Sequence, residues 1–155
     1  EIVLGVVSAP ALGRRWWAAQ GMGAFLRTGQ NPPEALRVSA VSAIEDASLS
    51  YSSLSGWQER GQAESFYQLA TACWRSRAYG DFWSYMMVAE GTVDIAAEPE
   101  LEIYDMAALV PIVIEAGGTV TSLEGEPGPW GTSAIASNAL LHEGARAILG
   151  SGAVR

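Results

Sequence analysis

Residues 98–118, the most informative stretch of the chain, read EPELEIYDMAALVPIVIEAGG. Asp105 precedes small and apolar residues at helical spacing, so the stretch predicts a helix over Asp105–Ala116 that ends at Gly117. Pro111 lies inside that helix, where it should remove one backbone hydrogen bond and bend the helix. Taken alone, Asp105 is interpreted as a helix cap, because Asp is strongly preferred at that position.

The rest of the chain alternates between helical and strand periodicity. Apolar residues at helical spacing predict further helices over about 63–74, 81–90 and 141–149. In the second of these, Asp81 is the expected N-cap and Gly91 the expected stop. Strands are expected over 1–8 and 14–19, which form a hairpin, and over 47–54, 93–97, 119–122 and 132–137. A turn followed by a short strand is expected within 21–25, and a short strand or an extended loop over 75–79. Helices and strands therefore alternate in the second half, which indicates the α/β class.

Composition limits the possible functions. The chain has 155 residues, one domain's worth, and 49% of them are hydrophobic, as in globular proteins. No apolar run is long enough to predict a membrane span. The net charge of −8 argues against a nucleic-acid partner. Cys73 is the only cysteine, which excludes an internal disulfide and fits a reducing, cytoplasmic compartment. His142, the only histidine, is interpreted as a surface or capping residue.

The charges are unevenly distributed. No Lys or Arg occurs between Arg77 and Arg146. The same stretch carries Asp81, Glu90, Asp94, Glu98, Glu100, Glu102 and Asp105. Such a block is most often a solvated acidic face. It is also suited to bind a hard cation such as Mg²⁺, which prefers carboxylate oxygens.

Two short motifs carry a resemblance to a known family. Tyr104-Asp105-Met106-Ala107-Ala108 and Glu115-Ala116-Gly117-Gly118 resemble the signature of the inositol monophosphatase family, with Tyr104 where Trp is usual. The run Arg77–Trp83 is most similar to the histidinol-phosphatase branch. The resemblance implies an α/β fold, the C-terminal part of a layered α/β sandwich with a mixed sheet and helices.

The resemblance also implies roles for three residues. It makes Asp105 a Mg²⁺ ligand, and it places Glu98, seven residues earlier, where the family contacts the substrate. Asp81 stands where the inositol branch has a neutral residue, so it is a second expected substrate contact, with a helix cap as the alternative. The family's other metal ligands, a Glu-Glu pair and an Asp-Pro-x-Asp-Gly-Thr loop, do not occur here, and no catalytic residue is assigned.

The chain opens at Glu1 in an apolar, β-branched run, as it would inside a strand. We therefore expect 1–155 to be the C-terminal portion of a phosphatase whose N-terminal metal-binding portion is absent. The implied activity is Mg²⁺-dependent hydrolysis of histidinol phosphate to histidinol and phosphate, with a small phosphorylated substrate as partner. Inositol monophosphate or a related sugar phosphate is the alternative substrate, and a non-catalytic truncated domain is the second alternative. The oligomeric state stays open, with a homodimer among the alternatives.

Overall fold

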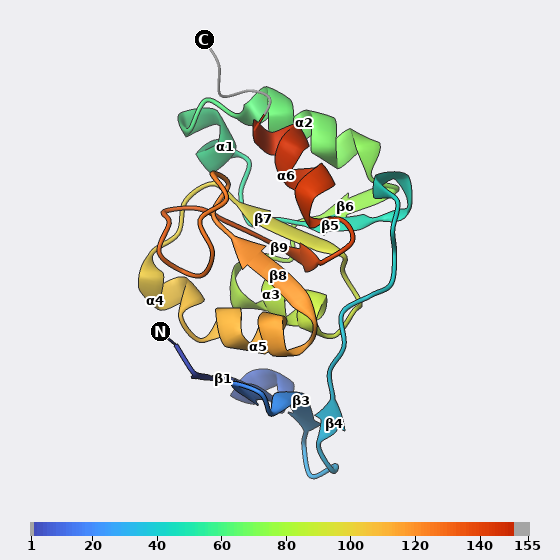
Figure 1. Ribbon diagram of the computed structural model, residues 1–155, viewed down its shortest axis with the longest axis vertical. Coiled ribbons are helices and arrows are strands. Elements are labelled where there is room, and N and C mark those ends of the chain that lie inside the picture. Colours follow the sequence, from blue (N-terminus) through green and yellow to red (C-terminus); the bar gives the residue numbers. More distant parts are fainter. Residues whose placement is uncertain (1, 151–155) are drawn as a thin grey trace.

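The first part of the chain forms an antiparallel sheet in the computed structural model, which describes residues 2–150 (Figure 1). Its strands follow the chain in order: β1 (Leu4–Ala9), β2 (Arg14–Ala19), β3 (Gly23–Thr28) and β4 (Glu34–Ala35). A 3-10 turn at Pro10–Leu12 joins β1 to β2 and ends at Gly13, whose φ of 63° suits glycine. The predicted hairpin is thus confirmed, with β1 at the sheet edge; Glu1 of the predicted strand lies outside the described residues.

A second sheet is mixed, as expected. Its strand order is β6-β5-β7-β9-β8. The strands are β5 (Ser48–Ser50), β6 (Arg75–Arg77), β7 (Ile95–Glu98), β8 (Gly118–Thr121) and β9 (Ala134–Asn138). β5 pairs in parallel with both β6 and β7, whereas β9 pairs antiparallel with β7 and β8. The carboxyl ends of β5 and β7 therefore meet at the same edge of the sheet.

Helices cover both faces of the mixed sheet, so the layers alternate between helices and sheets (Figure 1). On one face lie α1 (Ser55–Glu59), α2 (Ala63–Ala72) and α6 (His142–Gly150), after a 3-10 turn at Ile44–Asp46. Between the two sheets lie α3 (Asp81–Ala89), α4 (Ile103–Met106) and α5 (Leu109–Glu115). Each layer of helices has its own apolar core, one built around Trp16, Met86 and Ile112 and the other around Trp57, Leu69 and Ile135. The predicted layered α/β sandwich is confirmed.

The predicted helix over Asp105–Ala116 is wrong in one respect, because it is two helices. α4 ends at Met106 and α5 begins at Leu109. Pro111 is the third residue of α5, where its missing N–H costs little, since the first N–H groups of a helix have no partner inside it. The proline therefore separates two helices instead of bending one. Asp105 does not open a helix either, because α4 begins at Ile103 with Glu102 as its N-cap.

Two further residues differ from expectation. Asp81 is not an N-cap: Gly80 holds that position, no side-chain cap bond forms, and Asp81 is the first residue of α3. Gly91 follows the helix with a φ of 70°, as predicted for the stop. His142 is buried instead of exposed, and its two ring nitrogens lie 3.0 Å from the hydroxyls of Thr121 and Ser137. No helix within residues 2–150 is long and apolar enough to cross a membrane.

Candidate functional site

A cavity of about 570 Å³ lies where α3, α4, β1 and the end of β7 meet. Gly5 lets β1 approach the helices closely, because a Cβ there would come within 2.2 Å of the carbonyl oxygen of Ala108. The residues that line the cavity are Val6, Val7, Asp81, Phe82, Tyr85, Glu98, Glu100, Leu101, Tyr104, Asp105, Met106, Ala108 and Leu109.

The cavity brings together all three site residues expected from the sequence. Asp81 comes from the start of α3, Glu98 from the last position of β7, and Asp105 from α4. Two of them are exposed, whereas Glu98 is only 5% exposed. The carboxylates of Asp81 and Asp105 thus lie toward solvent and that of Glu98 lies deeper.

Glu98 is held by the strand next to its own. The hydroxyl of Ser52, two residues beyond β5, donates a hydrogen bond of 2.8 Å to Glu98 Oε2. The other carboxylate oxygen, Oε1, is buried without a hydrogen-bond partner. Burial raises the pKa of Glu98 to about 7; the Ser52 hydrogen bond opposes this rise, and the charges of Asp81 and Asp105 add to it. Near neutral pH this carboxyl therefore exists in both protonation states.

Asp105 stands in the first turn of α4. Its Oδ2 accepts a hydrogen bond of 3.0 Å from the backbone N–H of Glu102. A carboxylate oxygen is the type of ligand that a hard cation such as Mg²⁺ prefers. Within residues 2–150, however, no group of three or more His, Cys, Asp or Glu side chains is placed to hold a metal ion. Asp105 therefore offers at most one part of a metal site.

Asp81 adopts a backbone conformation that is unusual for its residue type. Its φ is 50°, and among the described residues it is the only non-glycine with positive φ. Asp tolerates this region better than most residues, but at an energetic cost. The preceding Gly80, at φ 80°, allows the sharp entry into α3. Because this backbone conformation costs stability, it points to a role of Asp81 in the site.

Tyr85 is a cavity residue that sequence reasoning missed. It lies four residues after Asp81, hence on the same face of α3. The helical spacing that predicts α3 could have placed it beside Asp81, but apolar spacing alone does not distinguish Tyr85 from a core residue. One residue earlier, the hydroxyl of Ser84 lies 2.7 Å from that of Ser50, which ties α3 to β5.

The described residues that line the cavity include four carboxylates and no Lys or Arg. Acidic residues grouped in a partly enclosed cleft attract cations and repel anions. This part of the chain is therefore poorly suited to bind a phosphate directly and well suited to bind a positively charged group.

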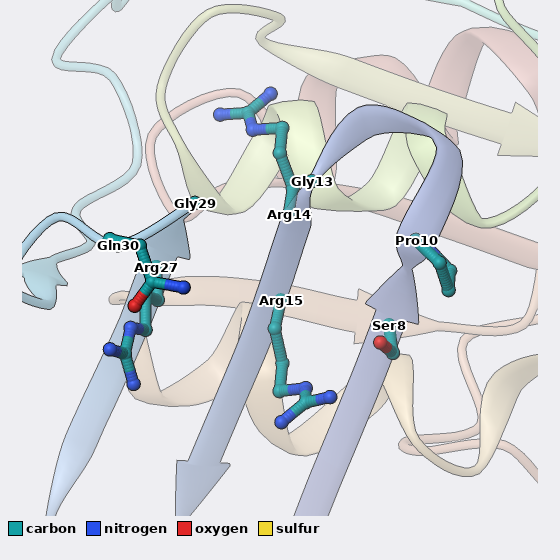
Figure 2. A pocket seen from close by; sticks show the side chains of 8 residues that line it. All are labelled: Ser8, Pro10, Gly13, Arg14, Arg15, Arg27, Gly29 and Gln30. Carbon is teal, nitrogen blue, oxygen red and sulfur yellow. The ribbon is translucent and has the colours of Figure 1, made fainter.

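A second cavity, of about 370 Å³, is basic and lies at one end of the first sheet (Figure 2). Figure 2 shows Arg14 and Arg15 pointing to opposite sides of β2. Arg14 forms an ion pair of 3.0 Å with Glu90, and Arg15 is the cross-strand neighbour of Arg27. None of the three site residues expected from the sequence lines this cavity, so the acidic cavity is the candidate site.

Comparison with known proteins identifies the family of the chain. The model of the inositol monophosphatase family matches residues 1–151. The chain is 58% identical to the histidinol-phosphatase of Streptomyces coelicolor over 141 residues, which is 91% of this chain and 53% of that protein. It is also 58% identical to the histidinol-phosphatase of Mycobacterium tuberculosis over 140 residues, 90% of this chain and 54% of that protein. The chain thus spans about half the length of these relatives.

Solved structures agree with this comparison. An inositol monophosphatase from Zymomonas mobilis superposes with a TM-score of 0.85 at 25% identity, over 95% of this chain and 57% of that one. An IMPase from Thermotoga maritima superposes with a TM-score of 0.84 at 30% identity, over 97% of this chain and 57% of that one. The matched fold, the family motifs and the relatives agree, and the chain belongs to the inositol monophosphatase family.

Proposed function

We propose that this chain supplies the wall that recognises the alcohol portion of the substrate in a Mg²⁺-dependent phosphomonoesterase, which hydrolyses histidinol phosphate to histidinol and phosphate. The observation that carries the proposal is the meeting of Asp81, Glu98 and Asp105 at one acidic cavity. We assign Asp81 and Glu98 to the alcohol portion and Asp105 to the metal.

The charge of the cavity supports this choice of substrate. Histidinol phosphate carries an ammonium group on its alcohol portion. The carboxylate of Asp81 and the ionised form of Glu98 suit such a group, because a hydrogen bond with an ionised partner is roughly twice as strong as a neutral one. The second carboxylate has no equivalent advantage for a neutral polyol.

Asp105 would contribute one ligand to Mg²⁺. Its carboxylate suits the ion chemically, although the described residues supply no complete set of ligands. When bound, Mg²⁺ would offset the charge of the phosphate and favour cleavage of the ester. The task of residues 2–150 is then to bind and orient the alcohol portion beside that ion.

The names of the relatives support histidinol phosphate, because the two relatives at 58% identity are both histidinol-phosphatases. Inositol monophosphate is the second candidate substrate, since both matched structures described above are inositol monophosphatases. We prefer the first candidate on account of Asp81, which adds a second carboxylate to the wall.

Three further assignments belong to the proposal. Residues 1–155 correspond to the C-terminal portion of such a phosphatase, a reading supported by the family motifs and by the share of the relatives' length that the chain covers. The enzyme works in the cytoplasm, which its single cysteine fits. A homodimer is the proposed oligomer, and light scattering of the complete enzyme tests it.

The experiment joins this chain to the part of the Streptomyces coelicolor relative that has no counterpart here. We expect the joined protein to release phosphate from histidinol phosphate with Mg²⁺. The 155-residue chain alone should release none, because Asp105 is only one ligand. Turnover by the chain alone would contradict the metal assignment. An inactive, folded joined protein, beside an active relative under the same conditions, would favour the non-catalytic alternative.

A further inference from the structure

Two buried polar atoms in the wall of the acidic cavity have no hydrogen-bond partner. One is the hydroxyl oxygen of Tyr85 and the other is Glu98 Oε1. Tyr85 is 1% exposed and Glu98 is 5% exposed, and both residues line the cavity. Buried polar groups are nearly always paired in folded proteins, so two unpaired atoms at one cavity require an explanation.

The hydroxyl of Tyr85 has no structural role within the described residues. Its ring packs in the core between the two sheets, a contact that Phe would make equally well. The unpaired hydroxyl carries a desolvation cost that no protein partner offsets. A ligand that hydrogen-bonds the Tyr85 hydroxyl would offset this desolvation cost.

The neighbouring acidic residues of the cavity also affect Tyr85. Burial raises the pKa of Tyr85 well above its ordinary value, and the charges of Glu98 and Asp105 raise it further. The phenol therefore stays protonated and can donate its O–H. Glu98 Oε1 can accept a hydrogen bond. A ligand group that accepts from one and donates to the other would pair both atoms, and hydroxyl, amine and imidazole groups all have this capacity.

We propose that Tyr85 is a specificity-determining residue of this cavity, whose hydroxyl hydrogen-bonds the polar alcohol portion of the ligand together with Glu98 Oε1. The inference rests on the proposed function, since it takes the cavity to be the site for the substrate's alcohol. It adds a neutral donor beside the two carboxylates already assigned. Asp81, one helical turn earlier, contacts the same ligand nearer the exposed side.

The test is Tyr85→Phe in the full 155-residue chain, with Tyr51→Phe as the matched control. Tyr51 is a half-buried tyrosine that packs against Phe66 in the other core, with ring centroids 5.0 Å apart, and it does not line the cavity. Calorimetric titration with L-histidinol and with myo-inositol measures binding without phosphate or metal. Thermal unfolding without ligand measures stability.

We expect Tyr85→Phe to unfold at the same temperature as the unmodified chain or higher, because it removes a buried hydroxyl that has no partner. The affinity for the ligand that the unmodified chain prefers should fall about three- to tenfold, as for the loss of one hydrogen bond. Tyr51→Phe should leave that affinity unchanged. Unchanged ligand affinity in Tyr85→Phe would overturn the inference, whatever the unfolding temperature of the variant.

The two proposals fail in different ways. If the unmodified chain prefers myo-inositol to L-histidinol, the histidinol assignment is contradicted. In that case, weaker binding of myo-inositol by Tyr85→Phe would still support the role of Tyr85.

Discussion

Ser52 donates a hydrogen bond of 2.8 Å to Glu98, and this bond joins the carboxyl ends of two neighbouring parallel strands at the candidate site. Ligands of α/β proteins often bind at this edge of a sheet, beyond the carboxyl ends of the strands. The bond fixes one oxygen of the carboxyl and leaves the other unpaired. Glu98 is therefore oriented by the fold while part of its bonding capacity remains free for a ligand.

Burial of Glu98 should make stability depend on pH. The pKa rises from 4.5 to about 7 on folding, so the stability associated with its neutral form is complete below pH 4.5 and is lost as pH rises through 7. Glu98→Gln cannot ionise. At pH 8 the variant should therefore be more stable, relative to the unmodified chain, than it is at pH 4.5. This change in the difference of the two free energies of unfolding should be roughly 2–3 kcal/mol, at about 1.4 kcal/mol per pKa unit.

Urea denaturation of both proteins at these two pH values measures the difference. The buried His142 is common to both chains, so its own titration cancels. A stability difference that does not change with pH would show that folding does not raise the pKa of Glu98 and that burial of its charged form costs little.

Asp105→Asn separates metal binding from helix stability. An Asn oxygen can still accept the N–H of Glu102, so the folded state should lose less than about 1 kcal/mol. In the joined protein the variant should bind Mg²⁺ more weakly and turn over more slowly, because the charged ligand is gone. Titration with Mg²⁺ and thermal unfolding check the two effects. An unfolded variant, with normal Mg²⁺ affinity in whatever remains folded, would return Asp105 to a structural role.

The strain at Asp81 predicts an unusual order of stability. At a φ of 50°, Gly is unstrained, Asp is tolerated and Ala is disfavoured. Asp81→Gly should therefore be at least as stable as the unmodified chain, and Asp81→Ala should be about 1 kcal/mol less stable than Asp81→Gly. Chemical denaturation of the three proteins checks this order. If the Ala variant is the most stable, the left-handed backbone is not a constraint on this residue.

The exposed edge strand of the first sheet predicts self-association of the isolated chain. β1 is an edge strand, and its side chains Leu4 and Val6 are 59% and 50% exposed. Edge strands with exposed apolar residues pair readily with other chains. Light scattering should give a mass above that of the 16.4 kDa monomer, and Leu4→Lys should lower it. A monodisperse monomer with a cooperative melt would show that this surface is stable in water.

Much of the fold could be predicted from periodicity, and the failures have local causes. The helices at α2, α3 and α6 and the first hairpin were predicted because their apolar spacing is regular. α1 was missed because Ser55–Glu59 is a single turn with a glycine and no repeating apolar position. The split between α4 and α5 was missed because the apolar pattern continues through it, while Pro111 acts on the backbone.

Three residues of the candidate site could be predicted from the sequence, whereas their contacts could not. Asp81, Glu98 and Asp105 came from motif positions and lie around one cavity. Their contacts depend on tertiary structure that spacing does not encode. The partner of Glu98, Ser52, lies 46 positions away in sequence. The unpaired hydroxyl of Tyr85 becomes visible only when its surroundings are known, because a tyrosine in an apolar helical stripe looks like any other core residue.

Recognition of a cationic alcohol by this wall is tested by the substrate preference of the joined protein, with and without the charge at Asp81. Asn tolerates the same backbone region as Asp, so Asp81→Asn removes the charge and keeps the conformation. The unmodified joined protein should have a higher kcat/KM for histidinol phosphate than for inositol monophosphate. Asp81→Asn should reduce that ratio by a factor corresponding to on the order of 1–3 kcal/mol. Equal losses for both substrates, or no loss for either, would contradict the claim that this wall recognises a cationic alcohol.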